Sequence, residues 1–188
     1  MNQETRIEFA KDIKREIRNI NFLVQSLLKL SKFDADSVKF INEEVKILEI
    51  IKNSVKNVSV LCVLKNINIQ INGNDTSKIY CDLNWQAEAI TNILKNCVEH
   101  SRDNSKIEIN YEENKVYSKI EIKDYGVGIH KDDLPHIFER FYKGKNSSSE
   151  SVGIGLALSK TIIENNNGYI GVESEVGKGT KFTIKYFK

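Results

Sequence analysis

The sequence predicts an α+β fold, a two-layer sandwich in which about three helices cover a mixed, mostly antiparallel sheet, with a further helix at the N-terminus. The N-terminal residues repeat apolar side chains at the spacing of a helix that pairs with another helix. Beyond residue 37, short alternating segments typical of strands are joined by tight turns. These strands are grouped apart from the helices, which favours an α+β fold over a parallel α/β fold.

The N-terminal segment is expected to form one long helix with an apolar stripe. Spacings of three and four residues place its apolar positions on one side: Ala10, Ile13, Ile17, Ile20, Val24 and Leu27. A lone helix of this kind leaves apolar surface in water, so we expect it to pair with a second helix. The alternative is a helix that packs along its own domain. Polar residues after Phe33 mark a boundary, which divides the chain into residues 1–36 and 37–188.

The second unit is expected to combine helices with short strands. Helices are predicted over residues 45–64, 83–100 and 155–164. Strands are predicted over residues 66–71, 106–111, 116–123, 169–173 and 180–186. The strands on either side of residues 112–114 form a predicted antiparallel hairpin. Asparagines and a glycine at residues 165–168 tolerate the left-handed conformation and therefore end the last helix.

Composition argues against some classes of partner. Lysine and arginine total 28 against 26 for aspartate and glutamate, so the net charge of +2 gives no reason to expect nucleic acid or an acidic membrane surface. The three cysteines lie far apart in apolar runs, as reduced thiols do in the cytosol. Apolar runs are far shorter than the roughly 20 residues of a membrane-spanning helix. We therefore expect a soluble, cytoplasmic chain.

Five short motifs follow one another along the second unit. They are NILKN at residues 92–96, DYGVG at 124–128, FERFY at 138–142, GIGL at 153–156 and GKGT at 177–180. Each is weak alone, but five in this order carry specific information. From about residue 20 to the end, the chain resembles the bacterial sensor histidine kinases of two-component systems. These belong to the GHKL superfamily, with gyrase, the heat-shock chaperone ATPases and MutL. The resemblance implies a catalytic, ATP-binding domain with the Bergerat fold.

Asp124 is the candidate for reading adenine. It ends a predicted strand, where its carboxylate can accept a hydrogen bond from the exocyclic amino group and repel the carbonyl oxygen of guanine. The resemblance implies the same role; the alternative is an aspartate in an ordinary turn. Gly126 and Gly128 either let the backbone approach the base or supply positive φ. The resemblance also implies that Thr180 supports adenine recognition, directly or through water.

Asn92 and Asn96 are the candidate catalytic residues. They lie four apart and therefore share one face of the predicted helix. Mg²⁺ prefers oxygen ligands, and the resemblance implies that Asn96 is its protein ligand beside the phosphates of ATP. The alternative is a surface or capping asparagine. His100 is a candidate for the nucleotide site or a structural helix-end histidine. Glu99 replaces a lysine common in the family, which removes one phosphate contact.

Position 92 distinguishes two reaction classes. In the hydrolytic relatives a glutamate four residues before the metal-binding asparagine activates water. Asn92 cannot act as a general base at neutral pH, so it disfavours hydrolysis. Transfer of the γ-phosphoryl group to another nucleophile remains, with positioning and charge neutralisation as the main catalytic effects.

A second phosphate-binding element is predicted where the third helix begins. Free backbone amides and the helix dipole favour phosphate at such a start, here formed by Gly153, Ile154, Gly155 and Leu156. The polar segment before it, residues 143–151, is predicted to form a mobile lid.

Basic residues near this lid are candidates for contacts with the β and γ phosphates. They are Arg140, Lys143 and Lys145, although a solvated charge run is an equal alternative for the two lysines. Phe138 and Phe141 are expected to anchor the lid, and the resemblance implies that this segment also faces the helix with the phosphoacceptor. Core packing is the alternative for both phenylalanines.

The acceptor histidine of an intact kinase is missing, since no histidine precedes His100. Residues 27–34 resemble the end of the second helix of the dimerisation hairpin, whose first helix carries that histidine. We therefore expect a fragment that binds nucleotide but cannot phosphorylate itself. The resemblance implies three partners: the dimerisation domain, a response regulator and a second copy through the N-terminal helix, with the full-length parent anchored in the cell membrane. The alternatives are a nucleotide-binding regulatory domain without transfer and an anti-sigma-type serine kinase.

Overall fold

The structure is a computed structural model that describes residues 3–144 and 152–188. Its helices are α1 (Gln3–Asp34), α2 (Ile47–Leu64), α3 (Leu83–His100) and α4 (Gly155–Asn165). Its strands are β1 (Glu43–Lys46), β2 (Asn68–Gly73), β3 (Lys78–Cys81), β4 (Lys106–Glu113), β5 (Tyr117–Asp124), β6 (Gly168–Glu175) and β7 (Gly179–Phe187).

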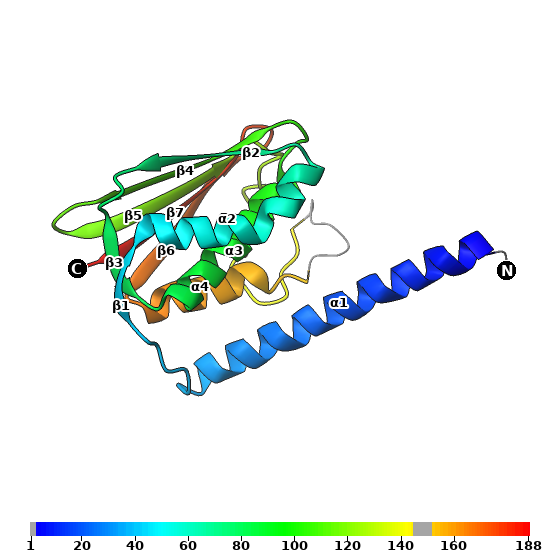
Figure 1. Cartoon of the computed structure of the whole chain (residues 1–188), viewed down its shortest axis with the longest axis horizontal. Coiled ribbons are helices and arrows are strands. Elements are labelled where there is room, and N and C mark those ends of the chain that lie inside the picture. The colour runs from blue at the N-terminus through cyan, green and yellow to red at the C-terminus, as the bar shows by residue number, and fades with distance from the viewer. Residues whose placement is uncertain (1–2, 145–151) are drawn as a thin grey trace.

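The main body of the molecule is a sheet covered by helices. Five strands pair in the order β2-β4-β5-β7-β6, parallel between β2 and β4 and antiparallel elsewhere. Figure 1 shows α2, α3 and α4 over one face of this sheet, with α1 extending away from it. The predicted two-layer α+β fold with a mixed, mostly antiparallel sheet is therefore confirmed.

The core lies between the sheet and α3. Alternate residues of the central strands face inward and are fully buried: Ile107, Ile109, Ile120, Ile122, Phe182 and Ile184. Ile90, Ile93 and Leu94 of α3 are buried against them. Each such side chain contributes roughly 1.5–3 kcal/mol through removal of apolar surface from water. Because α3 also packs between α2 and α4, it is a rigid base for the polar side chains that it carries.

Local chemistry explains where the elements begin and end. The bounds of α3 agree with the prediction, and Asp82 caps it by accepting from the backbone N–H groups of Asn84 and Trp85, at 3.0 and 3.2 Å. Helix α2 starts at Ile47, two residues later than predicted, because Val45 belongs to β1. The sequence did not reveal β1 and β3, which pair with each other; four residues are too few for a clear alternation.

Helix α1 is attached to the rest of the molecule near its C-terminal end. Leu30 and Phe33 are buried there, and the Phe33 ring lies edge-on to Trp85 with centroids 5.0 Å apart. Further toward the N-terminus, the heptad residues Ile13 and Ile17 are 45% and 60% exposed. Most of the apolar stripe is therefore open to solvent in this single chain. Within the described ranges, no helix is both long and apolar enough to cross a bilayer.

Candidate functional site

Asp124 is a buried carboxylate at the end of β5, only 2% exposed. Its Oδ1 atom accepts from the backbone N–H groups of Gly126, at 2.9 Å, and Thr180, at 3.2 Å. Burial raises the pKa of Asp124, while these two hydrogen bonds and one from the Cys97 thiol act in the opposite direction. Among the described residues, no lysine or arginine forms an ion pair with it. A buried acid held by neutral donors is costly, which is typical of a functional site.

Glycines allow two loops to close around this carboxylate. A Cβ on Gly126 would lie 2.2 Å from the backbone oxygen of His100, and one on Gly128 would lie 2.2 Å from the backbone oxygen of Glu175. Gly128 also has φ of +72°, a conformation that other residues rarely adopt. Backbone hydrogen bonds lock the arrangement, from Val127 N to His100 O at 3.2 Å and from Gly177 N to Val127 O at 2.8 Å. The DYGVG loop is thus held between α3 and the β6–β7 turn.

Thr180 is placed beside Asp124 by the first residues of β7. Its hydroxyl lies 2.9 Å from that of Ser174, which donates to the backbone oxygen of Gly179 and accepts from the N–H of Ile129. Because the single hydroxyl proton of Ser174 is used on Gly179, Thr180 donates to Ser174 and keeps its lone pairs free. Sequence reasoning missed Ser174, since one serine in a strand has no distinguishing pattern.

One face of α3 carries the three polar residues predicted there. Asn92 is 7% exposed, and its Nδ2 has no hydrogen-bond partner in the described part of the chain. Asn96 and His100 follow at one-turn intervals and are partly exposed. Burial lowers the pKa of His100, which Asp124 partly offsets and Lys65 reinforces. An orphaned buried amide indicates a place where a ligand supplies the missing acceptor.

Lys65 is a further residue that the sequence did not single out. Its ammonium group donates to the backbone oxygens of Val98, Glu99 and Ser101, at 3.0, 2.7 and 3.1 Å. It therefore satisfies carbonyl groups at the C-terminal end of α3, where cations are stabilising. Only the packing of α2 beside α3 creates this cap, so no local pattern could have shown it.

The GIGL motif forms the start of α4, directly against Asn92. A Cβ on Gly155 would lie 3.7 Å from the Cβ of Asn92. Gly153 has φ of +73°, and its backbone oxygen accepts from Phe141 N at 2.8 Å. Ile154 is fully buried and Leu156 packs partly against the core, so these two residues present backbone rather than side chains. Among the described residues, no side chain caps the N-terminus of α4.

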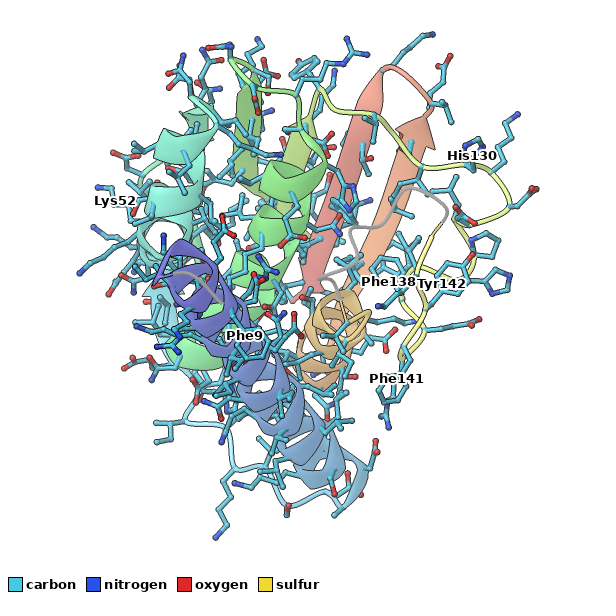
Figure 2. All side chains as sticks on the ribbon, turned by 90° about the vertical axis from the view of Figure 1, so that its right-hand side faces the viewer. Phe9, Lys52, His130, Phe138, Phe141 and Tyr142 are labelled. Atoms are coloured by element: carbon cyan, nitrogen blue, oxygen red, sulfur yellow. The ribbon has the colours of Figure 1, made fainter. Side chains whose placement is uncertain are left out.

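The three basic residues predicted to contact phosphate, Arg140, Lys143 and Lys145, have different surroundings in the structure. Arg140 donates to both carboxylate oxygens of Asp34, at 2.8 and 2.7 Å. Lys143 is exposed, and Lys145 lies outside the described residues. Phe138 packs against the core, whereas Phe141 is 56% exposed. Figure 2 shows Phe138 close to α4 and Phe141 at the outer edge of the molecule.

Residues 81–188, more than half of the chain, match the model of the family described as histidine kinase-, DNA gyrase B- and HSP90-like ATPases. The chain belongs to this family. All five motifs lie within the matched residues. The resemblance predicted from the motifs is thereby confirmed.

Two relatives of this chain are named as sensor proteins. It is 31% identical to the sensor histidine kinase YxdK of Bacillus subtilis, over 94% of this chain and 55% of YxdK. It is 30% identical to the sensor protein SrrB of Staphylococcus aureus, over 90% of this chain and 30% of SrrB. The chain therefore spans about half, or less, of the length of these relatives.

Solved structures agree on the fold. The Acinetobacter baumannii histidine kinase AdeS superposes with a TM-score of 0.79 at 22% identity, covering 94% of this chain and 82% of that one. Full-length ShkA in complex with AMPPNP superposes with a TM-score of 0.83 at 19% identity, covering all of this chain and 40% of that one. The fold of this chain is thus shared with these solved structures.

Proposed function

We propose that this chain binds Mg-ATP and transfers the γ-phosphoryl group to a histidine of a sensor kinase dimerisation domain, for relay to an aspartate of a response regulator. The observation that carries the proposal is Asp124, a buried carboxylate that neutral backbone donors hold in place. Its Oδ1 is used by Gly126 and Thr180, which leaves Oδ2 for an adenine amino group. A guanine carbonyl oxygen at that position would be repelled, so the site selects ATP over GTP.

The remaining recognition groups surround Asp124. Thr180 offers lone pairs beside it, and His100 at the end of α3 is close enough for the two charges to influence each other. Gly126 and Gly128 keep side chains out of the space next to the base. This arrangement explains why the motif has two glycines and one acid.

The phosphates are expected at the junction of α3 and α4. The backbone amides of Gly153, Ile154, Gly155 and Leu156 stand at a helix start that no described side chain caps. The orphaned Nδ2 of Asn92 supplies a donor beside them. Asn96 fits as the protein ligand of Mg²⁺, because its neutral amide oxygen suits a metal whose negative ligands come from phosphate. When bound, Mg²⁺ neutralises charge on the phosphates. Arg140, Lys143 and Lys145 would close over them from the lid.

The transfer step needs little from the protein besides position. A neutral imidazole nitrogen of the acceptor attacks the γ phosphorus, a P–N bond forms, and the bond to the β-γ bridging oxygen breaks. ADP leaves with the electron pair of the broken P–O bond. The phosphorylated imidazole is then positively charged, and it becomes neutral when its other ring nitrogen loses its proton to water. Asn92 provides no general base that would activate water instead. This is why transfer, rather than hydrolysis, is proposed.

The domain division follows from the same proposal. Residues 1–36 would be the second helix of the dimerisation domain and residues 37–188 the catalytic domain. The exposed stripe with Ile13 and Ile17 supports pairing with another helix, in a homodimer or with the first helix of a dimerisation hairpin. The chain would act on the cytoplasmic side of a membrane-anchored parent, without binding nucleic acid.

Calorimetric titration with ATP and Mg²⁺, with GTP as the control ligand, tests the proposal. Asp124→Asn should weaken ATP binding at least about tenfold, the cost of losing a charged hydrogen bond. Asn96→Asp should alter the Mg²⁺ dependence. Asp75→Asn is the matched control, because Asp75 accepts from the Tyr111 hydroxyl away from the site. Equal affinity for ATP and GTP would contradict the assignment of Asp124.

Transfer is tested separately, with a helical hairpin that carries an acceptor histidine, taken from the relative YxdK. Label from γ-phosphate-labelled ATP should appear on that hairpin and not at stoichiometric level on this chain. Nucleotide binding without transfer would indicate a regulatory domain, and label on serine would indicate the serine kinase alternative.

A further inference from the structure

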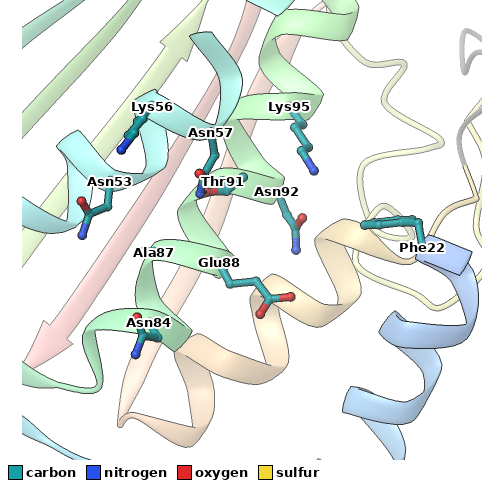
Figure 3. Close-up of a pocket in the computed structure, with 10 residues that line it drawn as sticks. All are labelled: Phe22, Asn53, Lys56, Asn57, Asn84, Ala87, Glu88, Thr91, Asn92 and Lys95. Atoms are coloured by element: carbon teal, nitrogen blue, oxygen red, sulfur yellow. The ribbon is translucent and has the colours of Figure 1, made fainter. Parts of the chain in front are cut away.

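A polar groove lies where α1, α2 and α3 meet. It has a volume of about 460 Å³ and is lined by Phe22, Asn53, Lys56, Asn57, Asn84, Ala87, Glu88, Thr91, Asn92 and Lys95 (Figure 3). Its floor is the outer face of α3, and Phe22 belongs to α1. None of the five motifs points to it except through Asn92 and Lys95.

Asn92 connects this groove to the proposed phosphate site. The residue is 7% exposed and lines the groove, and its buried Nδ2 has no hydrogen-bond partner in residues 3–144 and 152–188. On its other side, the first residue of α4 approaches so closely that a Cβ added to Gly155 would lie at contact distance, 3.7 Å. Asn92 therefore stands between the groove and the start of α4, where the phosphates are proposed to bind.

The groove has an excess of positive charge. Lys56 of α2 and Lys95 of α3 form no ion pair with any described residue, and the Lys95 ammonium lies 5.4 Å from the centre of the Phe22 ring. Glu88, the acidic lining residue, is already paired with Lys29 of α1. Two unpaired ammonium groups at one groove favour an anionic partner.

We propose that this groove docks an acidic segment of the protein that accepts the phosphoryl group, with Lys56 and Lys95 as the residues that select it. This inference rests on the proposed function. The two lysines stand on different helices with Asn57 and Thr91 between them, so they do not converge on one small ion (Figure 3). Asn53 and Asn84 extend the polar lining, as suits a partner with side chains spread along its length.

The contacts define what each residue does. The Phe22 ring holds the Lys95 ammonium at the groove through a cation–π contact. Asn57 donates to Thr91 at 3.2 Å, which joins α2 to α3 and keeps the two walls at a constant separation. Lys56 and Lys95 then act as positioning residues: they do not touch the reacting atoms, but they place the acceptor beside Asn92.

The test uses the full chain and the purified YxdK acceptor hairpin as the probe. Lys56→Glu/Lys95→Glu should raise the KM for the hairpin about tenfold, since two attractions become repulsions. The kcat and the calorimetric affinity for ATP should change less than twofold. Lys39→Glu/Lys115→Glu is the matched control, because both residues are exposed and lie outside the groove. Fluorescence anisotropy of labelled hairpin measures docking even if no phosphoryl group is transferred.

Charge exchange on the probe makes the inference specific. Replacing the acidic residues of the hairpin by lysine should restore its binding to the Lys56→Glu/Lys95→Glu variant. Higher salt should weaken docking to the parent chain more than to that variant. Loss of ATP affinity in the variant, an unchanged KM, or no hairpin binding by the parent chain would overturn the proposal. Saturable binding of inorganic phosphate that displaces the hairpin would instead show a small-anion site and would also overturn it. Failure of ATP to bind the parent chain contradicts the proposed function separately.

Discussion

The guanidinium group of Arg140 donates to both carboxylate oxygens of Asp34, at 2.8 and 2.7 Å, although the two residues are 106 positions apart. The pair joins the last residue of α1 to the segment that precedes α4. The hydrogen bond from Arg140 lowers the pKa of Asp34, so the pair is charged at neutral pH. A phosphate uses the same two-pronged geometry as a carboxylate, so a nucleotide would compete with Asp34 for these two N–H groups of Arg140.

Asp34→Asn is expected to raise ATP affinity about threefold. In the parent chain, Arg140 must leave its exposed ion pair with Asp34 before it can contact phosphate, and the variant removes that cost. Arg140→Ala should lower the affinity. Calorimetry with Mg-ATP measures both. Asp12→Asn serves as the control, since Asp12 pairs with Arg15 on the exposed part of α1, at 2.9 Å. Equal ATP affinity in all four proteins would show that Arg140 takes no part in nucleotide binding.

Trp85 provides a built-in reporter of how α1 is attached. It is the single tryptophan of the chain, and its ring contacts Phe33 of α1 with centroids 5.0 Å apart. Phe33→Ala should shift the Trp85 emission to longer wavelength and speed amide exchange in α1, because water replaces the lost ring. Protection of the strands should remain. Phe9→Ala is the control, as Phe9 is 59% exposed on the same helix; a red shift there would exclude a specific contact.

The periodicity of apolar residues was sufficient to predict those helices and strands whose pattern and end signals lie within their own sequence. The bounds of α3 match the prediction because it has a capping aspartate, an apolar stripe and a clear end. Strands β1 and β3 escaped because each has four residues and its pairing partner lies more than 30 positions away. Asn66, with φ of +51°, belongs to the turn after α2, so the predicted strand begins two residues later, at Asn68.

The candidate site divides in the same way. Residues within a motif, such as Asp124 and Asn92, could be selected from spacing and chemistry. Residues that the fold brings from elsewhere could not, such as Lys65 at the end of α3 and Ser174 beside Thr180. Arg140 shows the limit most clearly. Its charge indicated a phosphate ligand, but only the three-dimensional arrangement reveals a competing carboxylate on α1.

Asp124 should cost stability when no nucleotide is bound. Burial raises its pKa, so in the pH range between the ordinary value of 3.8 and the raised value the folded state holds a proton that the unfolded state has lost. Stability therefore falls as pH rises through this range, and the cost is complete once the pH exceeds the raised value. Asp124→Asn removes the buried charge and should stabilise the nucleotide-free chain at pH 7 by about 0.5–2 kcal/mol, measured by urea unfolding.

The pH dependence of that difference is the decisive control. The gap between Asp124→Asn and the parent chain should narrow as the pH is lowered through this range, because the parent carboxyl then takes up its proton. The same variant should lose ATP binding. A variant that is less stable than the parent at every pH would mean that the hydrogen bonds to Gly126 and Thr180 outweigh the desolvation cost.

Gly128 and Gly177 form a matched pair for testing how tightly the DYGVG loop is clamped. Both have positive φ, +72° and +84°, so alanine is strained at either position. At Gly177 an added Cβ meets nothing within 4 Å, and Gly177→Ala should cost only that strain, about 1 kcal/mol.

At Gly128 the Cβ would also lie 2.2 Å from the backbone oxygen of Glu175, which cannot move without disturbing β6. Gly128→Ala should therefore cost more than about 3 kcal/mol in urea unfolding and lower ATP affinity as well. Equal losses in the two variants would show that the loop and the β6–β7 turn separate easily, and the close contact would then contribute nothing to holding Asp124 in place.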